Sequence, residues 1–128
     1  MNKVVISVGS NIDPERHIND AKHALREEQT LVGESRFVKT APRGYTNQPE
    51  FLNGAFMIET DLDRADLKSY LKSLEKRLGR TRTANKNGPR TIDLDIVMFN
   101  NDIVDDDFYN YDFVKAAVED VIRQTEES

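Results

Sequence analysis

The order of strand-like and helix-like segments is the feature that most restricts the fold of this sequence. Apolar side chains recur every three to four positions at about residues 14–28 and 64–78, which predicts two amphipathic helices. Strand-like apolar runs flank them at residues 4–8, 31–40, 54–60 and 92–99. A further helical repeat begins at about Tyr111. The order β-α-β-β-α-β plus a C-terminal helix predicts an α+β, ferredoxin-like antiparallel sheet with helices packed on it.

Cap and turn residues set the limits of these segments. Asp13-Pro14 is a typical helix start, with Asp as the N-cap and Pro at the first helical position. Gly79 suits the left-handed residue that ends the second helix. Residues 40–53, rich in Pro, Gly and Asn, predict a loop, and residues 102–107, with four Asp, predict an acidic loop. Without repeats or linkers, residues 1–128 are expected to form a single domain.

Two acidic side chains lie on the strand that follows Gly88-Pro89. Apolar residues alternate there with the set Thr91, Asp93, Asp95 and Val97. Asp93 and Asp95 therefore share a face, with Cα atoms roughly 6.5–7 Å apart. Aspartate is depleted in strands, so the pair indicates a function, although a strand face turned to water would also accept it. Two carboxylates suit Mg²⁺, which takes its other ligands from water and phosphate.

A run of basic side chains precedes this strand. Its members are Lys76, Arg77, Arg80, Arg82, Lys86 and Arg90, with no acid among them. The whole chain has a net charge of −5, so the basic run is local. Guanidinium groups facing Mg²⁺ across a cleft form a clamp for a polyphosphate. A solvated loop and a local oligonucleotide site are the alternatives, and the lack of interleaved aromatic residues argues against the second.

The composition excludes several other classes of protein. The sequence contains no Cys, which excludes disulfides, cysteine-based zinc sites and a thiol nucleophile. The N-terminal apolar run is too short for a signal sequence, and none approaches membrane-spanning length. The acidic balance argues against general nucleic-acid binding. We therefore expect a soluble, cytoplasmic protein with no membrane or nucleic-acid partner; the sequence indicates no oligomeric state.

Four blocks of the sequence resemble 6-hydroxymethyl-7,8-dihydropterin pyrophosphokinases, enzymes of folate biosynthesis. They occur in the order of that family over roughly residues 3–99, and the last one is the most specific. The blocks are Gly9-Ser10-Asn11, Thr40-Ala41-Pro42-Arg43-Gly44, Gln48-Pro49-Glu50-Phe51-Leu52-Asn53 and Gly88-Pro89-Arg90-Thr91-Ile92-Asp93-Leu94-Asp95. The resemblance implies transfer of the terminal diphosphate of ATP to the hydroxymethyl group of a pterin, with release of AMP.

The resemblance assigns the charged residues to ATP and its metal ions. Asp93 and Asp95 would hold two Mg²⁺ ions that bridge the phosphates, and Asp95 or its metal would help to deprotonate the attacking hydroxyl. Phosphate contacts and catalysis would involve Arg80, Arg82 and Arg90. Glu75 and Ile96 match nucleotide-binding positions. By its sequence alone, Glu75 could equally be an exposed helix residue paired with a neighbouring Lys or Arg.

The resemblance assigns the long loop to the pterin. Phe51 would supply an aromatic platform and Asn53 a bidentate amide. Backbone groups of Thr40, Pro42, Arg43 and Gly44 would complete the contacts with the edge of the heterocycle. Without the family, Phe51 would be interpreted as a core aromatic and Asn53 as a side chain bonded to its own loop.

The chain departs from the family after the Asp strand. The usual Pro-His pair, Arg and second aromatic are missing, because no Pro follows Pro89 and both His lie near the N-terminus. Phe113 and Lys115 are candidates to replace the aromatic and the cation. A Trp common in the basic loop is Asn87, and the usual aliphatic pterin-loop residue is Arg43.

These departures leave two main hypotheses. The first is a short pyrophosphokinase, active but with a high KM for the pterin unless Phe113 rebuilds the missing wall. The second is a catalytically weak paralogue that binds a nucleotide or a pterin. The complete set of Asp and Arg residues favours the first, because a binding module has little need for a metal pair and a phosphate clamp.

Overall fold

The computed structural model describes residues 1–42, 47–79 and 91–126. Within them, a six-stranded antiparallel sheet has the order β2-β4-β1-β5-β6, and β3 also pairs with β4. The strands are β1 (Asn2–Ser10), β2 (Thr30–Glu34), β3 (Val38–Thr40), β4 (Phe51–Thr60), β5 (Asp93–Phe99) and β6 (Asp102–Ile103). The helices are α1 (Pro14–Glu28), α2 (Arg64–Arg77), α3 (Asp107–Asn110) and α4 (Asp112–Glu126).

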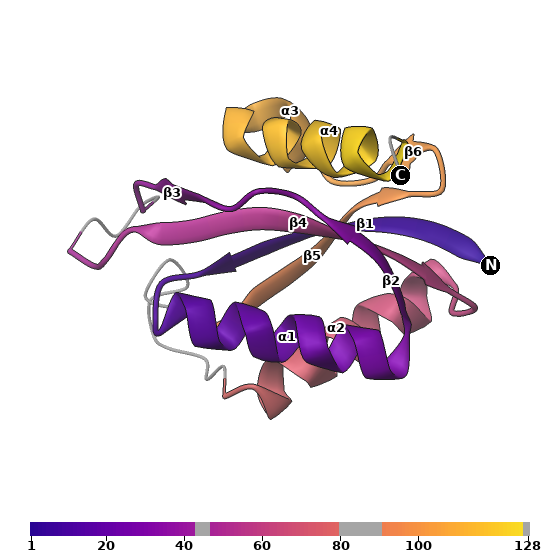
Figure 1. Cartoon of the computed structure of the whole chain (residues 1–128), viewed down its shortest axis with the longest axis horizontal. Coiled ribbons are helices and arrows are strands. Elements are labelled where there is room, and N and C mark those ends of the chain that lie inside the picture. The colour runs from indigo at the N-terminus through magenta and orange to yellow at the C-terminus, as the bar shows by residue number, and fades with distance from the viewer. Residues whose placement is uncertain (43–46, 80–90, 127–128) are drawn as a thin grey trace.

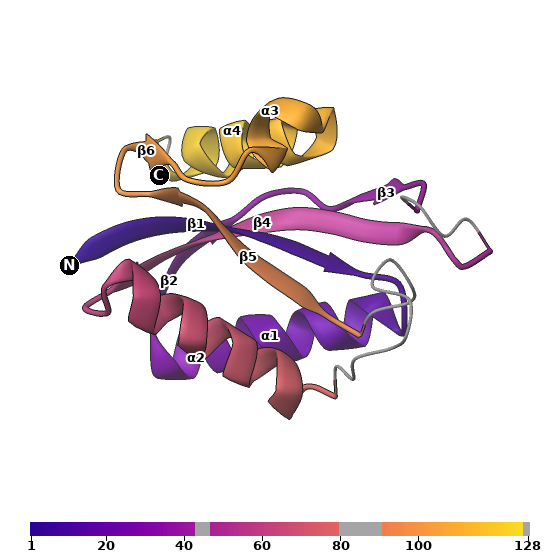
Figure 2. The same ribbon diagram turned by 180° about the vertical axis from the view of Figure 1, so that it is seen from behind.

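Helices cover both faces of the sheet. Figures 1 and 2 show α1 and α2 on one face and α3 and α4 on the other. The run β2-β4-β1-β5 and its two helices form the predicted ferredoxin-like α+β unit, and α4 is the predicted extra C-terminal helix. The expected fold is therefore confirmed. No helix in the described part of the chain combines the length and apolar character needed to cross a membrane.

Each face of the sheet has its own apolar core, because successive side chains of a strand point to opposite faces. The larger core joins the sheet to α1 and α2, with Ile6, Phe56 and Leu71 among its buried members. The smaller core joins it to α4 through Val5, Val97 and others. Burying one such side chain contributes about 1.5–3 kcal/mol, so α4 is part of the folded unit.

Three local predictions require correction. Asp13 precedes α1 with φ 41°, and its side chain does not cap the helix but pairs with Arg16 at 3.3 Å. The predicted strand 31–40 is interrupted at residues 35–37, where Phe37 turns inward onto Phe56 with 5.7 Å between ring centroids. The predicted acidic loop 102–107 contains β6 and the start of α3, because its polar side chains bond to the local backbone.

A bulge in β5 corrects the predicted alternation of that strand. Ile6 of β1 pairs with Ile96 and Val5 pairs with Met98, so Val97 is the extra residue on β5. Met98 was expected on the same face as Leu94. The bulge instead places Met98 against the α4-side core, together with Val97. The alternation of Asp93, Leu94, Asp95 and Ile96 lies before the bulge and is unaffected.

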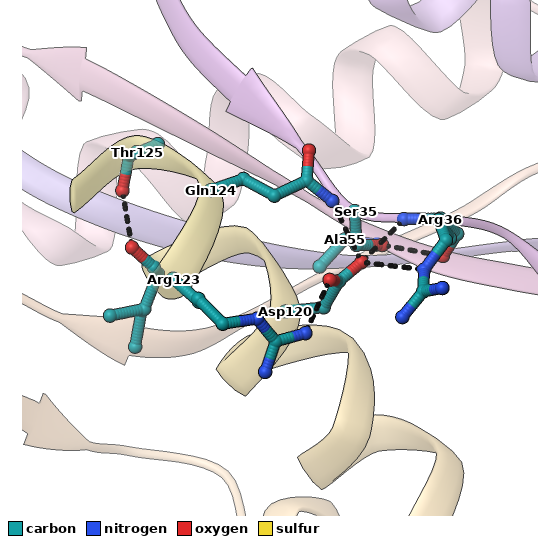
Figure 3. A network of polar contacts seen from close by, with 8 residues as sticks. Ser35, Arg36, Ala55, Asp120, Arg123, Gln124 and Thr125 are labelled. Atoms are coloured by element: carbon teal, nitrogen blue, oxygen red, sulfur yellow. Dashed lines mark hydrogen bonds and ion pairs between the residues drawn. The ribbon is translucent and has the colours of Figure 1, made fainter. Parts of the chain in front are cut away.

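A buried carboxylate of α4 bonds to the segment of residues 35–37 that separates β2 from β3 (Figure 3). Asp120, only 7% exposed, accepts a 2.7 Å hydrogen bond from the backbone N–H of Arg36. It also accepts hydrogen bonds from Arg123 and Gln124 of its own helix. The N–H of Arg36 and the other donors lower the pKa of Asp120. Asp120 therefore fixes the C-terminal half of α4 on the sheet.

Candidate active site

A cleft on the α4 side of the sheet contains most of the described residues that the sequence singled out. We call it the first cleft, and its lining combines aromatic, amide and carboxylate groups. It is lined by Ser7, Gly9, Thr40, Ala41, Phe51, Asn53, Asp93, Asp95, Asp107, Phe113 and Val114. Strands β1, β3, β4 and β5 and helices α3 and α4 all contribute, so the fold brings together residues more than 100 positions apart.

Strand register positions Phe51 and Asn53. Phe51 pairs with Thr40 of β3, and Asn53 lies between Gly9 of β1 and Val38 of β3. The Asn53 amide donates to the hydroxyl of Thr40. A Cβ at position 9 would lie 2.6 Å from the Asn53 Oδ1, so glycine leaves room for the amide. Asn53 is thus held by a neighbouring strand, and Phe51 is half-buried in the cleft wall.

The Gly-Ser-Asn block ties the end of β1 to the segment that leads into Phe51. Asn11 is 4% exposed. Its Nδ2 donates to the Gln48 Oε1 at 2.8 Å and to the Pro49 carbonyl at 3.1 Å. These bonds join two of the blocks that carry the family resemblance, and they fix where β4 begins.

Phe113 lines the first cleft together with Phe51. It lies in the first turn of α4, where its ring centroid is 5.8 Å from that of Tyr111. The structure therefore places a second aromatic residue where the sequence left one missing. Lys115, the other candidate replacement, is exposed on α4. Ser7, Asp107 and Val114 were not anticipated, since no local motif distinguishes them, and Ala41 lies in a family block but was given no role.

Asp93 and Asp95 face the first cleft from β5, opposite Gly9 and Ser7 of β1. Burial, followed by the negative charge of Asp93, raises the pKa of Asp95 to about 6, and the Lys72 ammonium opposes the shift. The two neighbouring carboxylates concentrate negative charge that a bound cation would relieve.

A second cleft adjoins the first at Asp95. It has a volume of about 400 Å³, within the usual range of about 300–1,000 Å³ for small-molecule sites. Helix α2, strand β5 and the segment after β6 form its walls. It is lined by Arg64, Lys68, Leu71, Lys72, Leu94, Asp95, Ile96, Val104, Asp105 and Asp106. Ile96, predicted to contact the nucleotide, is therefore in a cleft of suitable size.

Glu75 is not the exposed helix residue that the sequence allowed. It is 2% exposed, and its Oε2 accepts a 2.7 Å hydrogen bond from the N–H of Leu94. Among the described residues, β6 pairs with β5 at Met98 and Phe99, and the Val104 N–H bonds to the Val97 carbonyl, so Glu75 satisfies a further N–H nearer the start of β5. It also lies 3.5 Å from the Lys72 ammonium. Glu75 thus connects α2 to the strand of the Asp pair.

Several predicted site residues lie outside the first cleft or outside the described part of the chain. Pro42 is half-buried two positions after Thr40 and is not one of the described lining residues. Five others, and Asn87, lie outside the described residues. These five are Arg43, Gly44, Arg80, Arg82 and Arg90.

The two carboxylates fit Mg²⁺ in their chemistry. Mg²⁺ usually takes one or two carboxylates and completes its octahedron with water and phosphate oxygens. Within the described residues, no group of three or more His, Cys, Asp or Glu could hold a metal ion by itself.

Comparison with known proteins assigns the family. A sequence profile described as 7,8-dihydro-6-hydroxymethylpterin-pyrophosphokinase matches residues 5–123. The 2-amino-4-hydroxy-6-hydroxymethyldihydropteridine pyrophosphokinase of Bacillus subtilis is 35% identical over 138 residues, covering 98% of this chain and 82% of that protein. The protein of the same name from Pseudomonas aeruginosa is 36% identical and covers 80% of this chain. The chain therefore belongs to the 7,8-dihydro-6-hydroxymethylpterin-pyrophosphokinase family.

The matches differ in how much of each relative they cover. The chain spans 65% of the Pseudomonas protein. The folate synthesis bifunctional protein of Arabidopsis thaliana is 37% identical over 76% of this chain, which spans 20% of that protein. The family match extends to residue 123, well beyond the predicted limit near residue 99. Helix α4 with Phe113 is therefore within the family region.

Proposed function

We propose that this protein transfers the terminal diphosphate of ATP to the hydroxymethyl group of 6-hydroxymethyl-7,8-dihydropterin and releases AMP, as a step of folate biosynthesis. The observation that carries the proposal is the meeting of two different clefts at Asp95. One has aromatic and amide walls, and the other is large and has three basic side chains. The names of the bacterial relatives support the same reaction.

The pterin would bind in the first cleft. A flat heterocycle needs aromatic contacts for its faces and fixed polar groups for its edge. Phe51 and Phe113 are available for the faces and the Asn53 amide for the edge. Backbone groups of Thr40, Pro42, Arg43 and Gly44 would extend the edge contacts. The hydroxymethyl group would then point toward Asp93 and Asp95.

The nucleotide would bind in the second cleft, beside Ile96 and near Glu75. Arg80, Arg82 and Arg90 would hold its phosphates, since positioning and charge neutralisation carry most of the catalysis in phosphoryl transfer. Lys72 and Lys68 supply basic side chains on the α2 wall of this cleft, opposite the carboxylates of Asp105 and Asp106. The reaction centre would lie where the clefts meet.

Asp93 and Asp95 would hold two Mg²⁺ ions that arrive with the ATP. When bound, the metal ions would neutralise phosphate charge and make the attacking hydroxyl more acidic. Asp95 would also accept the proton of that hydroxyl, and its position at the border of both clefts supports this role. We place this reaction in the cytoplasm. The alternative is a catalytically weak paralogue that binds a nucleotide or a pterin, and the position of Asp95 at the border of both clefts favours the enzyme.

Release of AMP tests the proposal. Purified protein is incubated with ATP, Mg²⁺ and the pterin alcohol, and nucleotides are separated by chromatography. We expect AMP only when both Mg²⁺ and the pterin alcohol are present, and we expect Asp95→Asn to abolish it. A pterin that lacks the hydroxyl group is the matched control. Tight pterin binding without any AMP would support the binding module instead.

A further inference from the structure

Lys72 occupies the boundary between the two clefts. Its Nζ lies 3.5 Å from the Asp95 Oδ1 and 3.5 Å from the Glu75 Oε2. Its side chain is 41% exposed, whereas that of Glu75 is 2% exposed. One ammonium group on α2 therefore joins a buried acid of the same helix to the acid shared by the clefts.

The geometry of this contact is that of a loose ion pair. Charged N–H···O hydrogen bonds are usually about 2.7–2.9 Å long, and both distances from Lys72 exceed this range. The ammonium is thus shared between two carboxylates without a short hydrogen bond to either one. The pair with Asp95 is half-exposed on both sides and contributes about 0–1 kcal/mol, so a competing cation could displace Lys72 from Asp95 easily.

The second cleft provides another ligand for the displaced lysine. Lys72 lines this cleft together with Lys68 and Arg64, which precede it by four and eight positions. That spacing places all three on one helix face. They share this cleft of about 400 Å³ with the carboxylates of Asp95, Asp105 and Asp106, so a phosphate that enters it can pair with the basic side chains of α2 while a cation takes the acidic side. Lys is suited to such an exchange because its charge sits on a flexible stem.

We propose that Lys72 is an exchangeable counter-ion: it holds Asp95 and Glu75 in the metal-free protein, releases Asp95 to the incoming divalent cation, and then binds a phosphate of the nucleotide. This inference rests on the proposed function for the identity of the nucleotide. Lys72 is a positioning residue in the first state and a phosphate ligand in the second. Removing its charge should therefore affect the two binding events in opposite directions.

The test compares Lys72→Met with Lys68→Met, a matched loss of charge one turn earlier on the same helix face. Two affinities are measured by calorimetry: that for Mn²⁺ alone, and that for a non-hydrolysable ATP analogue with Mg²⁺. We expect Lys72→Met to bind Mn²⁺ about threefold to tenfold more tightly, because one competing charge near the site is gone. It should bind the nucleotide analogue about tenfold more weakly. Lys68→Met should weaken only nucleotide binding.

Lys72→Arg, which keeps the charge, checks that the Met variant changes electrostatics and not folding. It should stay within about twofold of the wild type for Mn²⁺, and melting curves should show that all three variants fold. Equal or weaker Mn²⁺ binding by a folded Lys72→Met protein would overturn the proposal, as would unchanged nucleotide binding. Neither assay contains a pterin, so their outcome is separate from whether diphosphate is transferred.

Discussion

The two clefts share Asp95 but are built by different interactions. Strand register and hydrogen bonds shape the first cleft, as the contact between Asn53 and Thr40 illustrates. Charged side chains of α2 and the partly open edge of β5 shape the second, where Lys72 and Glu75 meet. A site for a neutral ring can be preassembled by the backbone. In the second cleft, by contrast, charged side chains pair loosely with one another and remain available to a charged ligand.

Asp95→Asn should have the largest effect, because this residue belongs to both clefts. Loss of a phosphoryl-transfer metal ligand removes several kcal/mol of transition-state stabilisation, so kcat should fall by about a thousandfold or more. Without metal, the variant should be more stable than the wild type, because it lacks the charge whose burial raises the pKa of Asp95. We expect a gain of about 1 kcal/mol, which allows for solvent screening of a side chain that is 40% exposed. Initial rates measure the change in kcat, and urea unfolding measures the change in stability. Exposed Asp102→Asn is the control, and near-normal turnover by Asp95→Asn would contradict the assignment.

Asp120→Asn should act on the first cleft through α4. Hydrogen bonds to charged groups contribute about 1.5–3 kcal/mol, so we expect the free energy of unfolding to fall by about 2 kcal/mol. Since α4 also contains Phe113, pterin affinity should weaken while nucleotide affinity stays unchanged. Chemical denaturation and calorimetry test this against Glu119→Gln, an exposed neighbour. Equal losses for both ligands would show that the clefts are not independent.

Phe113→Ala should weaken pterin binding by about tenfold or somewhat more. A stacked aromatic contact contributes roughly 0.5–1.5 kcal/mol beyond its buried area, and about 1.4 kcal/mol corresponds to tenfold. Nucleotide binding should not change, because Phe113 lines only the first cleft among the described residues. Tyr109→Ala, at a side chain 70% exposed, controls for loss of an aromatic residue. If tight pterin binding survived in Phe113→Ala, another wall would have to exist.

Metal binding should depend on pH, whereas the shape of the first cleft should not. With a pKa of about 6, Asp95 is largely ionised at pH 7 and largely protonated at pH 5. A proton competes with the metal, so Mn²⁺ affinity should fall by about tenfold between these values. The stability of the metal-free protein should change in the opposite direction, rising as the pH falls. Because the pKa of Asp95 is raised in the folded state, protonation below about pH 6 favours that state. Calorimetry at several pH values should show both trends, and neither should be present in Asp95→Asn.

Glu28→Gln should have the smallest effect, because Glu28 lines neither cleft. Hydrogen bonds from Arg77 and then Tyr70 lower the pKa of Glu28 to about 2. Its stabilisation is present above the unfolded pKa of about 4.3 and is lost as the pH falls toward 2. Solvent screening limits it to less than about 1 kcal/mol. Urea midpoints of wild type and variant should differ slightly near neutral pH and converge only as the pH approaches about 2. If the difference between the midpoints grew as the pH fell, this prediction would be wrong.

The sequence predicted the features that depend on local periodicity. The apolar repeats of α1, α2 and α4 match the observed helices, and the alternation around Asp93 and Asp95 correctly predicted that both face one cleft. The ferredoxin-like order followed from the segments alone. These features need only the geometry of one element, so a single sequence contains enough information.

Features that depend on distant contacts were not predictable in the same way. The bulge at Val97 appears only in the pairing of β5 with β1, and the interruption after β2 depends on Asp120, more than 80 positions away. Phe113 was named only as a candidate, because its place in the cleft depends on how α4 packs. Lys72 had no signal at all, since its two carboxylate partners meet only in the folded chain.

The most direct test of the whole account is the composition of the pterin product. The pterin alcohol is incubated with protein, Mg²⁺ and ATP, and the product is analysed by mass spectrometry and phosphorus NMR. The account predicts a pterin with a diphosphate group on its hydroxymethyl oxygen, formed in equal amount to AMP. A pterin monophosphate formed together with ADP, or an unmodified pterin after full ATP turnover, would contradict it.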